Sequence, residues 1–322
     1  MRDLFEKPKC VAEAANAKKG WNWAVEILVF VAVFIVGNII MAMATLPIQI
    51  VLLALDNNYT AALESGDAAV IQDASMKMVS SDAYTICTLF ADIVLIVVVC
   101  LFCKLFQARK MTTLGFCKKG IFKEYIIGAI AGFAFFSAAV LIGVITGALK
   151  IEGINASFSI WIFLLYTVGF MIQGMAEEVV CRGYFMVSFA RRYPMWAAVL
   201  ANSLVFAALH LGNSGVSVLA LVNLTLFGIF ASVYFIRRGN IWGVAAFHSI
   251  WNLVQGCFYG IKVSGLDLKG LLITVPRDGK ELLNGGAFGM EGGIIVTIIF
   301  CIGIVILYFS KKSSEQEKPE NR

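Results

Sequence analysis

The residues best suited to chemistry are the only two histidines of the chain and a pair of adjacent glutamates. His210 and His248 lie in apolar stretches, and both follow Glu177 and Glu178, which are themselves embedded in an apolar stretch. Ionisable side chains in such surroundings are costly unless they line a cavity and act there. Carboxylates and imidazoles can take a proton from water near neutral pH. We therefore treat these four side chains as the candidate reactive groups.

Three short motifs place these residues one helical turn from a second notable side chain. The pairs are Glu178 with Arg182, Phe206 with His210, and His248 with Asn252. Residues four apart share a helix face, and two polar side chains on one face cannot both contact lipid. We expect His248 and Asn252 to point into a common cavity. Phe206 has an ordinary packing explanation.

The two adjacent carboxylates are expected to differ in role. Their mutual repulsion raises the proton affinity of at least one, while Arg182 favours the ionised form of Glu178. Glu178 is then a salt-bridged support, and Glu177 is free to exchange a proton. Simpler readings remain open: a helix-end ion pair also explains Glu178 with Arg182, and an interfacial anchor also explains His210.

Composition places the chain among membrane proteins. Of its 322 residues, 60% are hydrophobic and 15% are charged, and the mean hydropathy is +0.84. A soluble protein needs more polar surface, whereas a membrane-crossing helix needs about 20 apolar residues. The sequence predicts an all-α fold, a polytopic membrane helix bundle of about eight transmembrane helices in a single membrane domain (1–322). The expected spans are 24–55, 83–106, 125–149, 158–181, 195–211, 215–236, 241–260 and 292–310.

Basic residues are distributed unevenly among the expected connections. They gather before the first span, between the second and third, and after the fourth, sixth and eighth, whereas the connection from Asp56 to Asp82 is net acidic. The positive-inside rule then places both termini in the cytoplasm, with an N-terminal segment (1–22) and a C-terminal tail (311–322). The net charge of +5 reflects this topology, and no basic and aromatic interleaving indicates a nucleic-acid partner.

The three motifs together resemble a known family. E-E-x-x-x-R from Glu177, F-x-x-x-H ending at His210 and H-x-x-x-N from His248 occur in this order on successive expected spans. This pattern resembles the CAAX protease and bacteriocin-processing family of intramembrane proteases, also called the Abi family, with a catalytic core at about 160–256. A glycine-rich stretch, 285–293, is similar to the connection before the last helix in bacterial members.

The resemblance implies an intramembrane endopeptidase that cuts a peptide or a membrane protein. Glu177 would activate water, His210 would position it, and His248 with Asn252 would stabilise the oxyanion. Glu178 and Arg182 would support the base. The family is described as glutamate-dependent and without a metal cofactor. Glu177, His210 and His248 would nevertheless form a possible zinc ligand set of two imidazoles and a carboxylate.

The resemblance also implies a location and leaves competing functions. The expected site of action is the bacterial cell membrane, where the lipid bilayer surrounds the protein, with cleavage near the cytoplasmic face. One alternative is a proton-coupled transporter, in which buried acids and histidines relay protons. Another is a non-catalytic immunity protein that binds and sequesters a peptide.

One geometric conflict accompanies the expected spans. At 1.5 Å per residue, spans 158–181 and 195–211 put Glu177 near the cytoplasmic end of one helix and His210 near the outer end of the next. Such a separation is too large for one site. We therefore expect either that the helix carrying Glu177 runs on to about Phe189, or that the connection 212–216 dips into the bundle.

Overall fold

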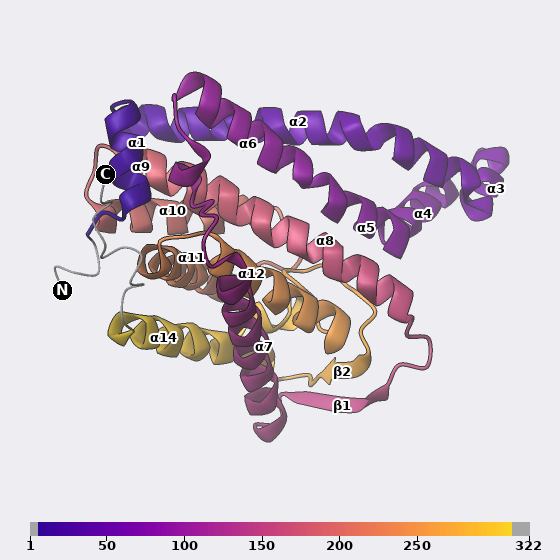
Figure 1. The fold of residues 1–322 in the computed structure, drawn as a ribbon. Helices are drawn as coiled ribbons and strands as arrows, with labels where there is room; N and C mark the ends of the chain where they lie inside the picture. Colours follow the sequence, from indigo (N-terminus) through magenta and orange to yellow (C-terminus); the bar gives the residue numbers. More distant parts are fainter. Residues whose placement is uncertain (1–5, 311–322) are drawn as a thin grey trace.

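The computed structural model describes residues 6–310 and shows a bundle of long helices (Figure 1). Five apolar helical segments are long enough to cross a membrane. The predicted all-α polytopic membrane bundle is therefore confirmed. The predicted tail, 311–322, and the first five residues of the predicted N-terminal segment lie outside the described residues.

The helices of the bundle coincide in place with the eight expected spans. Their bounds are α2 (Trp23–Leu55), α5 (Asp82–Ala91) continued by α6 (Ile93–Phe106), α7 (Ile121–Ile145), α8 (Ile160–Glu178), α10 (Met195–Leu209), α11 (Val218–Arg238), α12 (Trp242–Leu253) and α14 (Ile294–Phe309). Short α-helices lie outside them: α1 (Lys9–Ala17), α3 (Asn57–Ser65), α4 (Ala68–Val79), α9 (Val187–Ala190) and α13 (Glu281–Asn284). Three of these helices begin at a side chain that accepts hydrogen bonds from backbone N–H groups: Asn22 for α2, Asp56 for α3 and Ser217 for α11.

Two short strands close one end of the bundle, which we call the hairpin end. The strand β1 (Leu149–Ile154) pairs antiparallel with β2 (Leu272–Pro276), although more than a hundred residues separate them. Figure 1 shows this pair at the end opposite α1 and α9. Sequence analysis did not predict these strands, because each is short and neither shows a strict alternation of buried and exposed residues.

The opposite end, which we call the basic end, carries paired basic residues. Arg191 Nη2 lies 3.0 Å from Glu26 Oε1, and both side chains are buried. Arg238 Nε donates to Glu124 Oε2 at 2.7 Å. Arg109 is fully buried and donates to the carbonyl oxygen of Gly183 at 2.7 Å. These contacts join helix ends at the basic end of the bundle.

The helix that carries the glutamate pair is longer than predicted. α8 continues through a π-helical stretch, Val179–Met186, into α9, so one helical segment of 31 residues runs from Ile160 to Ala190. The predicted span, 158–181, therefore ended too early. The polar residues that seemed to end it, Glu178 and Arg182, lie inside the helix, because they pair with each other and Glu178 also pairs with His248 of α12.

This extension resolves the conflict in depth. From Glu177 to Ala190 the helix rises about 20 Å, and from Met195 to His210 α10 returns about 22 Å, at 1.5 Å per residue. The turn between Ala190 and Met195 makes the two helices antiparallel neighbours. Glu177 and His210 consequently lie at the same depth, well inside the bundle.

Close helix packing sets the position of α12 relative to its neighbours. A Cβ atom on Gly132 of α7 would lie 2.5 Å from the carbonyl oxygen of Phe247, and one on Gly174 of α8 would lie 2.4 Å from Ser249 Oγ. Only glycine permits such close approach of membrane helices. α12 is therefore held tightly between α7 and α8, next to the glutamate pair.

Candidate active site

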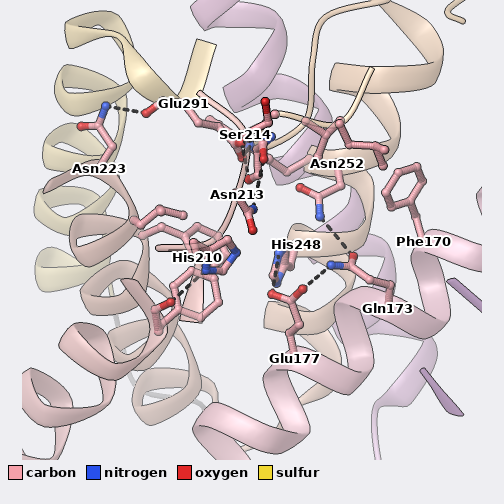
Figure 2. Close-up of a pocket in the computed structure, with 18 of the residues that line it drawn as sticks. Phe170, Gln173, Glu177, His210, Asn213, Ser214, Asn223, His248, Asn252 and Glu291 are labelled. Atoms are coloured by element: carbon pink, nitrogen blue, oxygen red, sulfur yellow. Dashed lines mark hydrogen bonds and ion pairs between the residues drawn. The ribbon is translucent and has the colours of Figure 1, made fainter. Parts of the chain in front are cut away.

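One cavity of about 380 Å³ brings the candidate residues together. Glu177 of α8, His210 at the end of α10, and His248 and Asn252 of α12 all line it, as Figure 2 shows. Its floor lies at the depth of Glu177, and its opposite side is formed by loops of the hairpin end. The predicted catalytic residues thus face one cavity within the helix bundle.

Glu177 is the accessible member of the glutamate pair. Its side chain is 30% exposed, whereas that of Glu178 is 0% exposed. Gln173, one turn earlier on α8, donates its Nε2–H to Glu177 Oε1, and Gln173 Oε1 accepts a hydrogen bond of 3.1 Å from Asn252 Nδ2. Sequence analysis missed Gln173, although its four-residue spacing from Glu177 signals a shared face. This glutamine links the proposed base to Asn252.

Glu178 is the centre of a buried charge cluster. Its Oε1 accepts hydrogen bonds from Arg182 Nη1 at 2.8 Å and from His248 Nδ1 at 2.9 Å. The guanidinium group of Arg182 also lies over the rings of Phe206 and Phe227, 4.7 and 5.4 Å from their centroids. The carboxylate therefore joins α8 to α12 and sets the orientation of the His248 ring.

The hydrogen bonds define which imidazole nitrogen faces the cavity. His210 Nδ1 lies 2.8 Å from the carbonyl oxygen of Phe206, and a carbonyl oxygen can only accept, so Nδ1 carries the proton. Nε2 of His210 is then a free acceptor. His248 likewise donates through Nδ1 to Glu178, and its Nε2 lies 3.8 Å from Glu177 Oε2. Only the imidazolium form of His248 has a proton on Nε2.

Phe206 has more than a packing role in this arrangement. Its carbonyl oxygen sets the tautomer of His210, and its ring packs 4.8 Å from the His210 ring and under Arg182. The sequence indicated only ordinary packing for this residue. A backbone contact has no signature in the side-chain pattern, so that part of its role could not be predicted.

The rim of the cavity is held by residues that sequence analysis did not single out. Glu291, within the glycine-rich stretch 285–293, accepts hydrogen bonds from Trp251 Nε1 at 3.1 Å and from Ser264 Oγ at 2.7 Å. Asn213 Nδ2 donates to the carbonyl oxygen of Ser264 at 3.0 Å. Three loops of the hairpin end are thereby fastened to one another above the candidate residues.

The possible zinc ligands do not converge as a metal site. Within residues 6–310, no three side chains of His, Cys, Asp or Glu are grouped so that they could hold one ion. Glu177, His210 and His248 are thus arranged around the cavity rather than about one point. The donor set as placed does not fit a tetrahedral zinc centre.

Replacing Glu178 by glutamine tests the buried cluster. The change leaves Arg182 without a counter-charge in a buried position. We therefore expect the free energy of unfolding to fall by about 3 to 5 kcal/mol. The measurement is the thermal melting temperature in detergent. Glu177→Gln, the neighbouring change of the same type at a more exposed carboxylate, is the matched control and should melt close to the wild type. Equal melting of the two variants would contradict the supporting role of Glu178.

Comparison with known proteins agrees with this geometry. Residues 157–254 match the family model described as Type II CAAX prenyl endopeptidase Rce1-like. This stretch holds every candidate catalytic and supporting residue, and it confirms the resemblance to the CAAX protease family. No curated protein and no solved structure matches the chain. The matched stretch, less than a third of the chain, is thus similar to a protease family.

Proposed function

We propose that the chain, matched by the CAAX prenyl endopeptidase family over its central helices, is an intramembrane endopeptidase that hydrolyses a peptide or a membrane protein with water activated by Glu177. The observation that carries the proposal is the convergence of Glu177, His210, His248 and Asn252 on one cavity at membrane depth. An amide bond needs a base within reach of water and donors for the developing negative charge. The cavity offers both.

In the proposed mechanism, Glu177 and His210 share the attacking water. The carboxylate of Glu177 takes a proton from water, and the oxygen adds to the scissile carbonyl carbon. The free Nε2 of His210 accepts a hydrogen bond from the second O–H of the water, which stays on the attacking oxygen, and this bond orients the lone pair. When the C–N bond breaks, the proton held by Glu177 passes to the amine that leaves. Proton and electron pairs balance without another reactant.

His248 and Asn252 are proposed to stabilise the oxyanion. The imidazolium form of His248 presents Nε2–H to the cavity, and the ring lies between the carboxylates of Glu177 and Glu178. Asn252 uses one amide N–H for Gln173, which leaves its second for the substrate. Both donors strengthen their interaction only as charge develops on the carbonyl oxygen.

Glu177→Gln tests the proposed base. An amide cannot take the proton, so we expect peptide hydrolysis by the purified protein to fall by about a hundredfold or more. The folded state should survive. Glu281→Gln, an exposed glutamate of α13 outside the cavity, is the control for removal of one carboxylate. Turnover near the wild-type rate in Glu177→Gln would reject the mechanism, and an immunity phenotype that persists would favour the non-catalytic alternative.

We further propose that the reaction needs no metal ion. Activity in detergent should then survive exhaustive treatment with a chelator, and the purified protein should contain no stoichiometric zinc. Elemental analysis and turnover on the same preparation provide the measurement. Loss of activity on chelation, with recovery when zinc is added, would instead make Glu177, His210 and His248 ligands of a metal.

The placement of the cavity bears on the side of the membrane at which the substrate is cut. Its rim consists of hairpin-end loops that carry Asn213, Ser214, Ser264 and Leu266. If the basic end is cytoplasmic, as the positive-inside rule predicts, the cavity opens toward the outer side. Cleavage then takes place in the outer half of the membrane, opposite to the prediction from sequence of a cut near the cytoplasmic face.

Single cysteines can test this sidedness. We expect Ser214→Cys, at the exposed rim, to react with a membrane-impermeant maleimide on intact cells. Lys118→Cys, exposed at the basic end, should react only after the cells are opened. The labelling of the unmodified protein, which has its own cysteines, is the baseline. The reverse pattern would place the cavity mouth in the cytoplasm and restore the original prediction.

A further inference from the structure

A second cavity, which we call the side cavity, adjoins the catalytic one. It has a volume of about 240 Å³ and lies between α2, α6, α10 and the helical segment that carries Glu177. Both cavities are lined by Glu177, Phe206, His210 and Asn213. A substrate whose scissile bond lies at Glu177 would therefore reach the side cavity with a residue next to that bond.

The side cavity contains a carboxylate at an unusual position. Asp92 lies where α5 meets α6, in the middle of an apolar helical segment of 25 residues. Charged side chains at such depth are rare and mark binding or transport of a charged group. The Asp92 carboxylate does not cap its own helix, and within residues 6–310 it has no hydrogen bond or ion pair. It is held without a counter-charge.

The neighbouring groups do not supply that counter-charge. The other titratable residues that line the side cavity are Glu177, Cys181 and His210, and no lysine or arginine in the described part of the chain lines it. Arg182, the nearest buried cation along the helix, is committed to Glu178. His210 is held by Phe206 through Nδ1 and is assigned to the water. A cation that complements Asp92 must come from outside the chain.

The walls of the side cavity suit an amphipathic side chain. Phe34, Leu95, Val180 and Leu209 provide apolar surface. Asn38 adds a polar group: its Nδ2 donates to the carbonyl oxygen of Phe34 at 2.8 Å, so its Oδ1 remains available as an acceptor. Lysine and arginine combine an apolar stem with a cationic head. The cavity matches this combination, with the stem along the walls and the head between the two acceptors.

We propose that the side cavity is a specificity subsite for a lysine or arginine side chain of the substrate, adjacent to the scissile bond, and that Asp92 is its counter-charge. The inference rests on the proposed peptidase function and adds a requirement to the substrate. The ammonium or guanidinium head contacts Asp92 and Asn38 Oδ1. Its binding fixes the register of the substrate chain, so the neighbouring carbonyl lies at Glu177.

Hydrolysis of matched peptides provides the first test. The purified full-length protein is given internally quenched peptides that differ at one position. That position is lysine, uncharged norleucine or glutamate in turn. We expect the lysine peptide to exceed the norleucine peptide in kcat/KM by about tenfold at one position beside the cut. In Asp92→Asn this ratio should fall to about one. Asp82→Asn, on the same helical segment but bonded to Tyr166 away from both cavities, should keep the ratio.

Two results would overturn the subsite. One is a wild-type enzyme that cuts the norleucine peptide as fast as the lysine peptide at every position. The other is an Asp92→Asn variant that loses activity equally on the lysine and norleucine peptides. An unchanged ratio of their kcat/KM values would mean that Asp92 has a purely structural role. If the wild type hydrolyses no peptide of the set, the proposed function fails, and a measurement that needs no turnover then decides the subsite.

That second measurement uses a cysteine in the wall of the side cavity. Leu209→Cys is made with Cys181→Ala, and its reaction with a cationic and an anionic methanethiosulfonate reagent is followed, each rate normalised to that with a free thiol. We expect the cation to be favoured by about tenfold and the preference to vanish when Asp92→Asn is added. Equal normalised rates in the presence of Asp92 would reject its role as a counter-charge.

Discussion

The rest of the site depends on one buried carboxylate, that of Glu178. It lies fully out of contact with solvent and accepts hydrogen bonds from both Arg182 and His248. Buried charges are tolerated only when their partners are fixed in good geometry. Because the three residues come from α8, its π-helical extension and α12, the requirement for pairing fixes these elements relative to one another. The geometry of the proposed catalytic site is therefore a consequence of this charge pairing.

Helix length is the second determinant of the site. A membrane helix interrupted near Glu178 could not bring Glu177 to the depth of His210. The structure instead combines a 31-residue helical segment with the short α10, which ends inside the bundle at His210. The π-helical stretch begins directly after Glu178. Such stretches are frequent at functional sites, where they change the direction of side chains along a helix.

The sequence predicted the parts of this design that local patterns encode. Hydropathy located the helices, and four-residue spacings identified Glu178 with Arg182 and His248 with Asn252 as residues of one face. It could not predict the run of the helix to Ala190, since a polar cluster looks like a helix end until its partner, His248, is known to lie beside it. Gln173, Glu291 and Asp92 were missed for the same reason. Their significance arises from neighbours distant in sequence.

The glutamate pair illustrates how environment divides labour between identical side chains. Glu178 is fully buried, and its Oε1 accepts hydrogen bonds from two cationic or potentially cationic donors, Arg182 and His248. Glu177, one position earlier on the helix, accepts a hydrogen bond from the neutral amide of Gln173, lies 3.8 Å from His248 Nε2 and faces the cavity. It is the carboxylate of the pair that water or a substrate can reach. The same comparison applies to Asp92, which lacks even an amide partner. A carboxylate kept in apolar surroundings without a donor is poised to bind whatever cation enters with the substrate.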